Sequence, residues 1–501
     1  MRSALILCLL GSTAIAGDPR FEPRDAPHHV YSGGWEHFVG GGVATIDCNA
    51  DALPDLYVAG GDNPAQLMRN TSSPSVSFVA DTPDTLALTG VIGAYPLNID
   101  GDTHADLVIL RVGPDAIMRG IGDCQFEPFD LGFQSGDHWT TAFSATWETG
   151  QTLPTLAFGT YVDRADPKGP FQTCDDTLLY RPDGDVYGTP ETLSPGYCAL
   201  SMLFSDWSRD GRADLRVSND RHYYVRGGQE QMWAMEDTPR LYTAEEGWKP
   251  YSIWGMGIAS RDMNGDGFSD VYLTSMGDQK FQYFDPETGG PTYVDATYAR
   301  GTTAHRPHLG EDGRPSTGWH AAFGDVNNDG RDDVFVAKGN VEQMPDAAMQ
   351  DPNTLLIQGI DGVFTEMAGP AGLASMARSR GAALADFNRD GLLDLAVVNR
   401  RVPMEIYENV TDGGNWLSVQ LTGAHPNTSA IGAHIEVCAP HGTDCQTREV
   451  TVGGGHAGGI LGNHHFGLGD LSAARLQVIW PDLSKTDWQD VSVNEKVIVN
   501  R

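Results

Sequence analysis

Carboxylates recur at alternate positions in six short segments of this chain. The segments are DCNADALPD from Asp47, NIDGDTHAD from Asn98, DWSRDGRAD from Asp206, DMNGDGFSD from Asp262, DVNNDGRDD from Asp325 and DFNRDGLLD from Asp386. Oxygen-bearing side chains stand at positions 1, 3, 5 and 9 of every segment. Five or six hard oxygens on a flexible loop suit Ca²⁺, whereas Zn²⁺ would require Cys or His ligands.

The segment from Asp325 illustrates the predicted geometry. Asp325, Asn327, Asp329 and Asp333 supply side-chain oxygens, and Arg331 offers its backbone carbonyl at position 7. An EF-hand would need Glu at position 12 and flanking helices, whereas here the closing acid at position 9 opens a strand. Asp332, at position 8, is expected to point away from the ion, so Asp329→Ala should cost more than Asp332→Ala. The alternative reading is a series of acidic turns without metal.

We therefore predict about six Ca²⁺ sites in the chain. Their predicted ligands are Asp47, Asn49, Asp51, Asp55, Asn98, Asp100, Asp102, Asp106, Asp206, Ser208, Asp210, Asp214, Asp262, Asn264, Asp266, Asp270, Asp325, Asn327, Asp329, Asp333, Asp386, Asn388, Asp390 and Asp394. Without a cation, three carboxylates held within a few ångströms repel one another. The ions should therefore contribute to the folding free energy.

A seventh copy of the pattern has lost its acids, because Trp147, Thr149, Gln151 and Thr155 stand at its ligand positions, and we expect no ion there. The seven copies begin 49 to 63 residues apart. Each is followed by a short stretch with apolar residues at alternate positions, such as DVFVAK after the fifth intact copy, which predicts a strand. Self-similarity at this period predicts an all-β, seven-bladed propeller over residues 33–410, with 161–190 and 285–320 as loops on its rim.

The N-terminus predicts export. Arg2, the apolar run 4–10 and Ala14-Ile15-Ala16 form a secretory signal peptide over residues 1–16, followed by an N-terminal segment, 17–32. A buried first strand is the alternative. Six cysteines remain after cleavage, and fifteen pairings are possible. We expect Cys438 to pair with Cys445 across a short polar loop, and Cys174 with Cys198. The protein should be extracellular or periplasmic.

The charge balance narrows the range of partners. The net charge is −34, from 67 acidic and 33 basic residues. Nucleic acid is an improbable partner, since phosphates demand a basic face. No later segment is apolar for long enough to span a bilayer. An extracellular protein or a glycan remains as the partner.

The acidic repeats resemble the FG-GAP/VCBS repeats of calcium-binding propellers, a type that also occurs in integrin α-subunit heads. The segments GGNWLSVQLTGAHPNTSAIGAHIEV (413–437), REVTVGGG (448–455), HHFGLGD (464–470) and RLQVIWPD (475–482) resemble the ASPIC/UnbV domain. That domain follows FG-GAP repeats in the cartilage acidic protein-like family. The resemblance implies extracellular calcium binding, and in some members adhesion, but no known reaction.

Residues 411–501 should form a small β-sandwich or barrel. Strands are expected at about 416–422, 433–438, 447–452, 463–468, 475–480 and 490–499. Trp416, Leu417, Val419 and Leu421 are expected in one packed wall, and the other is expected to contain Phe466, Leu468, Val478 and Trp480. The linker 408–415 is short, so the domain should dock on the propeller, with Trp416 and Trp480 as candidates for the shared surface, and hold the last blade against the first.

Three residue groups could serve other chemistry. His456, His464 and His465 are either a metal or acid/base site or ordinary loop histidines. A second group could form an active centre at the propeller mouth: His305, His308 and His320 with Glu311 and Asp312. A third group, on the rim, could stack on a sugar: Trp233 and Trp248 with Glu230, Glu236, Glu245 and Glu246. The expected function is extracellular binding or adhesion, and the alternative is a lyase-like carbohydrate-active enzyme that uses the propeller mouth.

Overall fold

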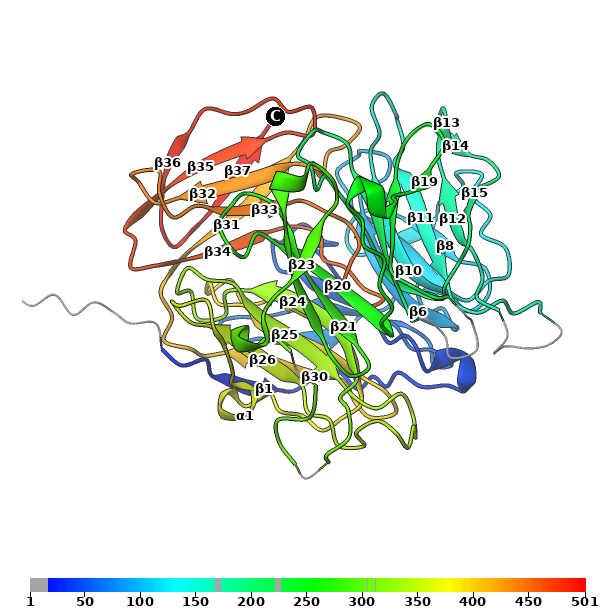
Figure 1. Cartoon of the computed structure of the whole chain (residues 1–501), viewed down its shortest axis with the longest axis horizontal. Coiled ribbons are helices and arrows are strands. Elements are labelled where there is room, and N and C mark those ends of the chain that lie inside the picture. Colours follow the sequence, from blue (N-terminus) through cyan, green and yellow to red (C-terminus); the bar gives the residue numbers. More distant parts are fainter. Residues whose placement is uncertain (1–16, 167–172, 221–226, 304, 311) are drawn as a thin grey trace, which may run out of the picture.

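The computed structural model describes residues 17–166, 173–220, 227–303, 305–310 and 312–501. The predicted signal peptide, 1–16, and Glu311 lie outside the described residues. Seven four-stranded antiparallel sheets form a β-propeller, and two further sheets form a C-terminal domain beside it (Figure 1). The predicted all-β fold, a propeller followed by a small β domain, is confirmed.

Each of the first six blades is built from consecutive stretches of chain. The first blade contains β2 (Val43–Ile46), β3 (Asp55–Val58), β4 (Gln66–Asn70) and β5 (Phe78–Ala80), and the second contains β6 (Val91–Leu97), β7 (Asp106–Arg111), β8 (Ala116–Gly120) and β9 (Phe126–Pro128). The third contains β10 (Thr140–Thr146), β11 (Thr155–Thr160), β12 (Thr177–Tyr180) and β15 (Glu191–Leu193), and the fourth contains β16 (Ala199–Ser205), β17 (Asp214–Asn219), β18 (Gln231–Ala234) and β19 (Arg240–Leu241). The fifth contains β20 (Gly255–Arg261), β21 (Asp270–Ser275), β22 (Lys280–Phe284) and β23 (Tyr293–Asp295), and the sixth contains β24 (Gly318–Gly324), β25 (Asp333–Lys338), β26 (Thr354–Gln358) and β27 (Phe364–Glu366).

The seventh blade closes the ring with a strand from the other end of the propeller. It contains β28 (Ser379–Ala385), β29 (Asp394–Asn399), β30 (Glu405–Asn409) and, outermost, β1 (Phe21–Arg24). β1 pairs antiparallel with β30, from Phe21 opposite Asn409 to Arg24 opposite Ile406. The segment 17–32 thus contributes a blade strand, and this strand joins the seventh blade to the chain that begins the first; the C-terminal domain also contacts both of these blades, through Trp416 at Gly391 and through Gly459 at Thr45.

The two stretches expected as rim loops contain blade strands. β12 lies within 161–190, next to a two-stranded ribbon of β13 (Pro182–Asp183) and β14 (Val186–Tyr187), and β23 lies within 285–320. Alternation is too brief to detect in strands of three or four residues that polar, Pro- and Gly-containing segments surround. Helices are short: η1 (Trp35–His37), η2 (Ala244–Glu246), η3 (Pro286–Thr288), η4 (Tyr298–Arg300) and α1 (Ala368–Ala371).

The C-terminal domain is a two-sheet sandwich. One sheet has the order β34-β31-β37 and the other β33-β32-β35-β36. The strands are β31 (Asn415–Thr422), β32 (His434–Cys438), β33 (Gln446–Glu449), β34 (His464–Gly469), β35 (Ala473–Ile479), β36 (Gln489–Ser492) and β37 (Glu495–Asn500). The single strand expected at 490–499 is two strands, one in each sheet.

The core of this domain is continuous with that of the propeller. Leu417, Val419 and Leu421 are buried in the same apolar cluster as Tyr95 and Phe143 of the propeller. Trp416 is not in the packed wall, because alternation along β31 turns it to the opposite face, where it packs against Gly391 of the seventh blade. Trp480 is buried in the domain's own core. The docked arrangement is thus the one expected, with Trp416 at the shared surface.

Three disulfides link the six cysteines of the described residues. Cys438–Cys445 and Cys174–Cys198 are formed as predicted, and the remaining pair, Cys48–Cys124, joins the first blade to the second. Stable disulfides are typical of oxidising compartments. Within the described part of the chain, no helix is long and apolar enough to cross a membrane.

Candidate calcium sites

The six acidic segments are equivalent loops in six blades. Each connects the first strand of a blade to the second, and its position-9 Asp is the first residue of that second strand, as in β3, β7, β17, β21, β25 and β29. The loops therefore lie on one face of the propeller at the same height. The register derived from the acidic spacing matches that of the strands.

All six loops share an unusual backbone conformation. The residue at position 4 is left-handed in each: Ala50 (φ 60°), Gly101 (70°), Arg209 (57°), Gly265 (75°), Asn328 (56°) and Arg389 (63°). For a residue with a side chain this conformation costs roughly 1–2 kcal/mol, so four loops retain it against its cost. The conformation turns the side chains at positions 1, 3 and 5 toward the inside of the loop.

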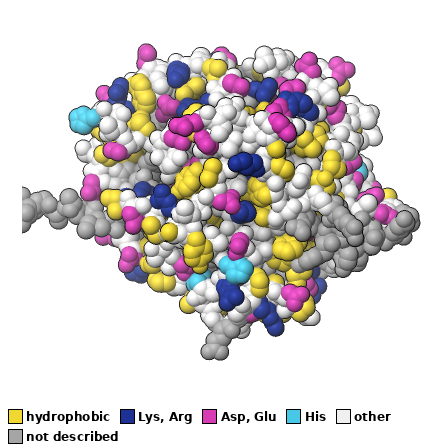
Figure 2. All heavy atoms as spheres, in the orientation of Figure 1, with side chains coloured by type: hydrophobic (Ala, Val, Ile, Leu, Met, Phe, Trp, Pro, Cys, Tyr) yellow, Lys and Arg dark blue, Asp and Glu magenta, His cyan; other side chains and the backbone are white. Residues whose placement is uncertain are grey.

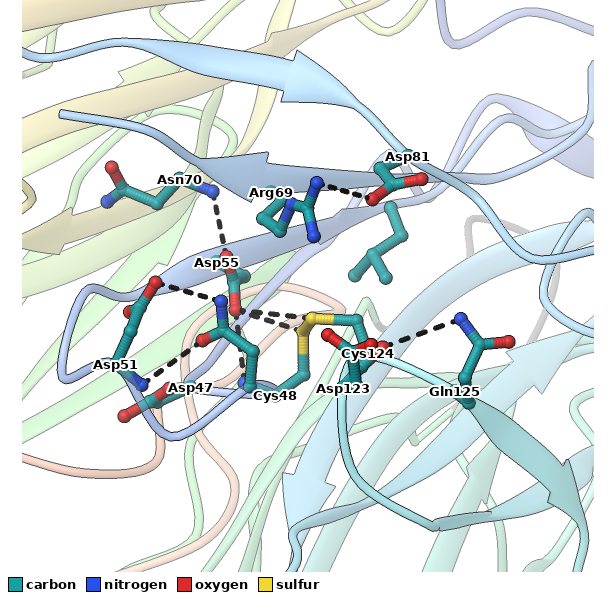
Figure 3. Close-up of a disulfide and its surroundings, with 12 residues drawn as sticks. Asp47, Cys48, Asp51, Asp55, Arg69, Asn70, Asp81, Asp123, Cys124 and Gln125 are labelled. Carbon is teal, nitrogen blue, oxygen red and sulfur yellow. Dashed lines mark hydrogen bonds and ion pairs between the residues drawn. A yellow bond between two sulfur atoms is a disulfide. The ribbon is translucent and has the colours of Figure 1, made fainter.

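Hydrogen bonds to the loop acids organise each loop, and Figure 3 shows those of Asp55 in the first blade. In the first blade, Asp47 accepts the N–H of Ala52 at 3.0 Å, and Asp55 accepts those of Cys48 at 3.0 Å and Asn70 at 2.8 Å. The position-9 Asp accepts equivalent bonds in the other intact loops, for example from the N–H groups of Val326 and Gln358 to Asp333. The fourth blade differs in one bond, because there the indole N–H of Trp207, rather than the backbone N–H at position 2, donates to Asp214. Each carboxylate retains lone pairs that these bonds do not use.

Two buried amide oxygens test whether a cation fits. Asn98 Oδ1 at position 1 of the second loop and Asn327 Oδ1 at position 3 of the sixth-blade loop are buried, and neither has a hydrogen-bond partner among the described residues. A buried, unpaired oxygen is unfavourable, and both belong to the predicted ligand set. The donor set of carboxylate, amide and carbonyl oxygens thus fits Ca²⁺.

A tighter cluster that includes Asp55 of the first loop is not a second metal site. Among the described residues, Cys48, Asp55 and Cys124 are the group of three whose ligand atoms lie within 4.8 Å of one another. Both cysteines are committed to one disulfide (Figure 3), and a disulfide offers no thiolate to a metal. The loop carboxylates are spread more widely, held apart by backbone N–H groups that they accept.

Burial of the loop acids opposes their ionisation. Desolvation, followed by smaller effects that include neighbouring loop carboxylates, raises the pKa of Asp55 and Asp106 to about 7 and that of Asp270 and Asp325 to about 8. At neutral pH these acids are thus costly to ionise unless a cation compensates.

This gives a pH-dependence for the calcium-free protein. An acid with a raised pKa in the folded state binds more protons folded than unfolded, so its contribution to stability falls as pH rises toward that pKa. Chelated protein should therefore lose stability from pH 6.5 to pH 8, and calcium should flatten the loss. Below pH 6.5 the buried neutral His456, with its pKa lowered to about 3, opposes the trend. Urea unfolding at both pH values, with and without calcium, measures this; equal slopes would contradict it.

The loop of the third blade keeps the turn without the acids. Gly150 at position 4 is left-handed (φ 84°). Glu148 accepts hydrogen bonds from Thr155 at 2.7 Å and from Arg181 Nε at 2.8 Å. A guanidinium thus supplies positive charge beside this loop, together with the packing of Trp147 against the core.

We predict that this third loop binds no calcium. None of its four ligand positions carries a carboxylate, and Glu148 is already paired with Arg181. Crystals grown with a lanthanide in place of calcium should show anomalous peaks in the other loops and none between Trp147 and Thr155. A peak there would contradict the prediction.

Asp332 has a role that its position in the loop did not indicate. Its side chain is buried and pairs with Arg448 of the C-terminal domain at 3.0 Å and with Arg261 at 3.3 Å. The expectation that its loss matters less than that of Asp329 assumed a solvated side chain. Removing one partner of a buried pair costs about 3–5 kcal/mol.

The calcium content of two variants should distinguish the role of Asp329 from that of Asp332. We predict that Asp329→Ala lowers the bound calcium by one ion, whereas Asp332→Ala keeps all ions and lowers the unfolding free energy by about 3–5 kcal/mol. Metal analysis and urea unfolding of both variants make the comparison, with Asp332→Asn as the volume-matched control. Loss of the ion in Asp332→Ala alone would show that the register is wrong.

The C-terminal domain covers the loop face of the propeller. Glu449 accepts the N–H of Asp206 and the hydroxyl of Ser205, both at 2.6 Å, in the fourth blade. In the sixth blade, His465 Nε2 lies 2.7 Å from Asn328 Oδ1. Asn98 of the second blade donates to Thr428 at 2.9 Å. Predicted calcium loops therefore serve as the platform on which this domain sits.

A glycine-rich loop of the domain fills the propeller channel. Residues 452–461 bond to the inner strands of successive blades: Gly459 O accepts from Thr45, Ala457 O from Ala94, and Val452 O from Ala145, and the N–H groups of Gly454 and Gly455 donate to Met202 and Ile258. We call residues 452–461 the plug. At Gly458 only glycine fits, because a Cβ there would lie 2.2 Å from Val43 O. The Gly run was visible in the sequence, but its destination was not.

The histidines do not assemble into a catalytic group. His456 is buried in the plug, where its backbone N–H donates to His320 Nδ1 at 3.0 Å and its ring lies beside Trp319. His305 pairs with Asp278, and His308 lies 3.2 Å from Glu366. The mouth centre predicted from His305, His308 and His320 is therefore not formed among the described residues.

The two tryptophans that were expected to be exposed on the rim are buried instead. Trp233 and Trp248 are buried in inter-blade cores, and Glu230 is buried and accepts the N–H of Asn219 at 2.9 Å. Neither tryptophan presents a face to solvent on which a sugar could stack. Nothing in the sequence marked Arg448, Asp332 and Glu449 as interface residues, because the contacts that join the domain to the propeller span more than a hundred residues.

Two family models match the chain. Residues 325–397 match the FG-GAP-like repeat, and residues 423–501 match ASPIC and UnbV. The β-propeller thus contains an FG-GAP-like repeat at 325–397, and the C-terminal domain matches ASPIC and UnbV at 423–501.

Among solved structures, the chain is similar to that of BBS1N in complex with ARL6DN, with 10% sequence identity and a TM-score of 0.45. The similarity covers 78% of this chain and 95% of that chain. It is also similar to an Agrocybe aegerita lectin that recognises non-reducing terminal N-acetylglucosamine, with 14% identity, coverage of 71% and 88%, and a TM-score of 0.39. No curated protein matches the chain.

Proposed function

We propose that this is a secreted protein that binds about six Ca²⁺ ions and, in that state, binds an extracellular protein or glycan. The observation that carries the proposal is the set of six loops with one register and one backbone conformation, two of which hold buried amide oxygens without partners. Side-chain oxygens at positions 1, 3, 5 and 9 and the carbonyl at position 7 would hold each ion. When bound, calcium would offset the repulsion among buried carboxylates.

A binding role is favoured over catalysis by the contents of the channel. The plug occupies the place where a propeller enzyme would admit its substrate, and the mouth histidines have separate partners. The export signal and the three disulfides support an extracellular location.

Two measurements on protein secreted from its own signal test this proposal. Mass spectrometry of the metal content after gel filtration should find about six calcium ions per chain, and N-terminal sequencing should begin at Gly17. Retention inside the cell, or a chain free of calcium after purification in millimolar calcium, would overturn it.

A further inference from the structure

A cavity of about 1060 Å³ lies between the propeller and the C-terminal domain. One wall is formed by the loops of the first, second and seventh blades, and the other by β31 and β37, with the plug between them. Asp47, Arg389, Thr422 and Glu495 line it and are exposed, so solvent reaches it. Its volume is at the upper end of the range for small-molecule sites, which suits a ligand larger than a monosaccharide.

The deep end of the cavity holds two arginines that share one carboxylate. Arg448, with a 3% exposed side chain, and Arg261 both pair with Asp332. Arg448 Nε is buried without a hydrogen-bond partner among the described residues. Burial and the charge of Arg261 lower the pKa of Arg448 to about 9, and burial and both guanidiniums lower the pKa of His464 to about 3. Two guanidiniums thus share one carboxylate at this end, and Arg448 keeps a donor without a partner.

Each acid that lines the cavity accepts at least one hydrogen bond from a neighbour. The N–H groups of Ala52, His104 and Gly391 donate to Asp47, Asp102 and Asp386, respectively. Asp206 and Ser205 donate to Glu449, and Ser492 donates to Glu495.

Four basic or neutral polar side chains on the walls lack hydrogen-bond partners among the described residues. The side chains of Arg389 and Lys496 make no hydrogen bond or ion pair with any residue that the structure describes, although the Lys496 ammonium lies near the charges of Asp47 and Arg389, and the side chains of Ser418 and Gln420 on β31 likewise make no hydrogen bond. The free groups facing the cavity are therefore mainly donors, from bases near both ends and from a hydroxyl and an amide between them. A ligand that satisfies them must carry anionic groups and many neutral oxygens.

We propose that this cavity binds an acidic oligosaccharide, with a carboxylate of the sugar held by Arg261 and Arg448 and its hydroxyls by β31. The inference rests on the proposed binding function and names its ligand class. Planar guanidinium matches carboxylate in two parallel hydrogen bonds, and walls that mix polar side chains with apolar ones such as Phe323 and Leu384 suit a sugar, whose ring carries hydroxyls at its edge and apolar C–H groups on its faces. The face drawn in Figure 2 instead mixes acidic and basic side chains, so the cavity offers charge selection that this outer surface does not.

Titration calorimetry on the calcium-saturated full chain tests the proposal. The probe is a hyaluronan tetrasaccharide, which carries carboxylates, and the control ligand is neutral chitotetraose. The acidic probe should bind at least about tenfold more tightly, because a hydrogen bond to a charged group contributes roughly 1.5–3 kcal/mol, or about tenfold or more. Arg261→Gln and Lys496→Gln should each weaken it, the first by about tenfold or more. Lys485→Gln, an exposed base of the same domain outside the cavity, should leave it unchanged.

Several results would overturn the proposal. They are equal affinity for the two sugars, equal loss in Lys485→Gln and Arg261→Gln, or tighter binding of a hexaglutamate peptide than of the tetrasaccharide. Lys496 lies at the open end of the cavity without a structural partner, so its variant keeps the test valid if Arg261→Gln fails to fold. Calcium content is measured on the same samples. Absence of calcium would contradict the proposed function, whereas loaded protein that ignores the acidic sugar would contradict this inference alone.

Discussion

Removal of calcium should lower the melting temperature sharply and release the C-terminal domain. Each site held at 100 times its dissociation constant contributes about 2.7 kcal/mol, and six are predicted. Without ions, repulsion among carboxylates such as Asp325, Asp329 and Asp333 would distort loops that the domain contacts directly through Asn328 and Asp332. The loss of stability and the loss of docking should therefore occur together.

Calorimetry and limited proteolysis measure these two effects. Protein with calcium and protein with chelator are compared at matched ionic strength, and new cleavage is expected in the junction 410–415 of the chelated sample. Magnesium at the same concentration serves as the control and should restore little, since it demands stricter octahedral geometry. An unchanged melting temperature, with no metal in the untreated protein, would rule out calcium as a structural component.

A single methyl group at the channel wall should be enough to expel the plug. A Cβ on Gly42 would lie 1.7 Å from Ala457 O, and one on Gly93 would lie 1.8 Å from the same oxygen. Both contacts are with backbone, which cannot rotate away as a flexible side chain could. We therefore expect Gly42→Ala and Gly93→Ala each to lower the unfolding free energy by at least about 3 kcal/mol, the upper end of the usual cost of overpacking.

Urea unfolding and small-angle scattering check this prediction. The variants should be less stable and more extended than the wild type, because the plug anchors the domain in the channel. Gly188→Ala is the matched control, since a Cβ at Gly188 meets nothing within 4 Å, and it should change stability by less than about 0.5 kcal/mol. Wild-type stability in both channel variants would show that the plug is not seated as described.

Much of the propeller could be predicted because its signals are local. The spacing of acids places ligand oxygens on one side of a turn, and alternation of apolar residues follows from the two-residue period of a strand. The position-9 acids therefore coincide with strand starts, as Asp270 and Asp394 do. The pair Cys438–Cys445 is local in the same sense, as the two residues end one short loop.

The rest depends on contacts between distant parts of the chain. The pairing of β1 with β30, the burial of Asp332 under Arg448 and the seating of His456 against His320 join residues more than a hundred positions apart. No local period reports such contacts, because they arise when whole elements pack and bury surface together. The sequence by itself thus determined the acidic loops, their register with the strands and their repetition. Only the tertiary structure decided that a second domain covers those loops and fills the channel between the blades.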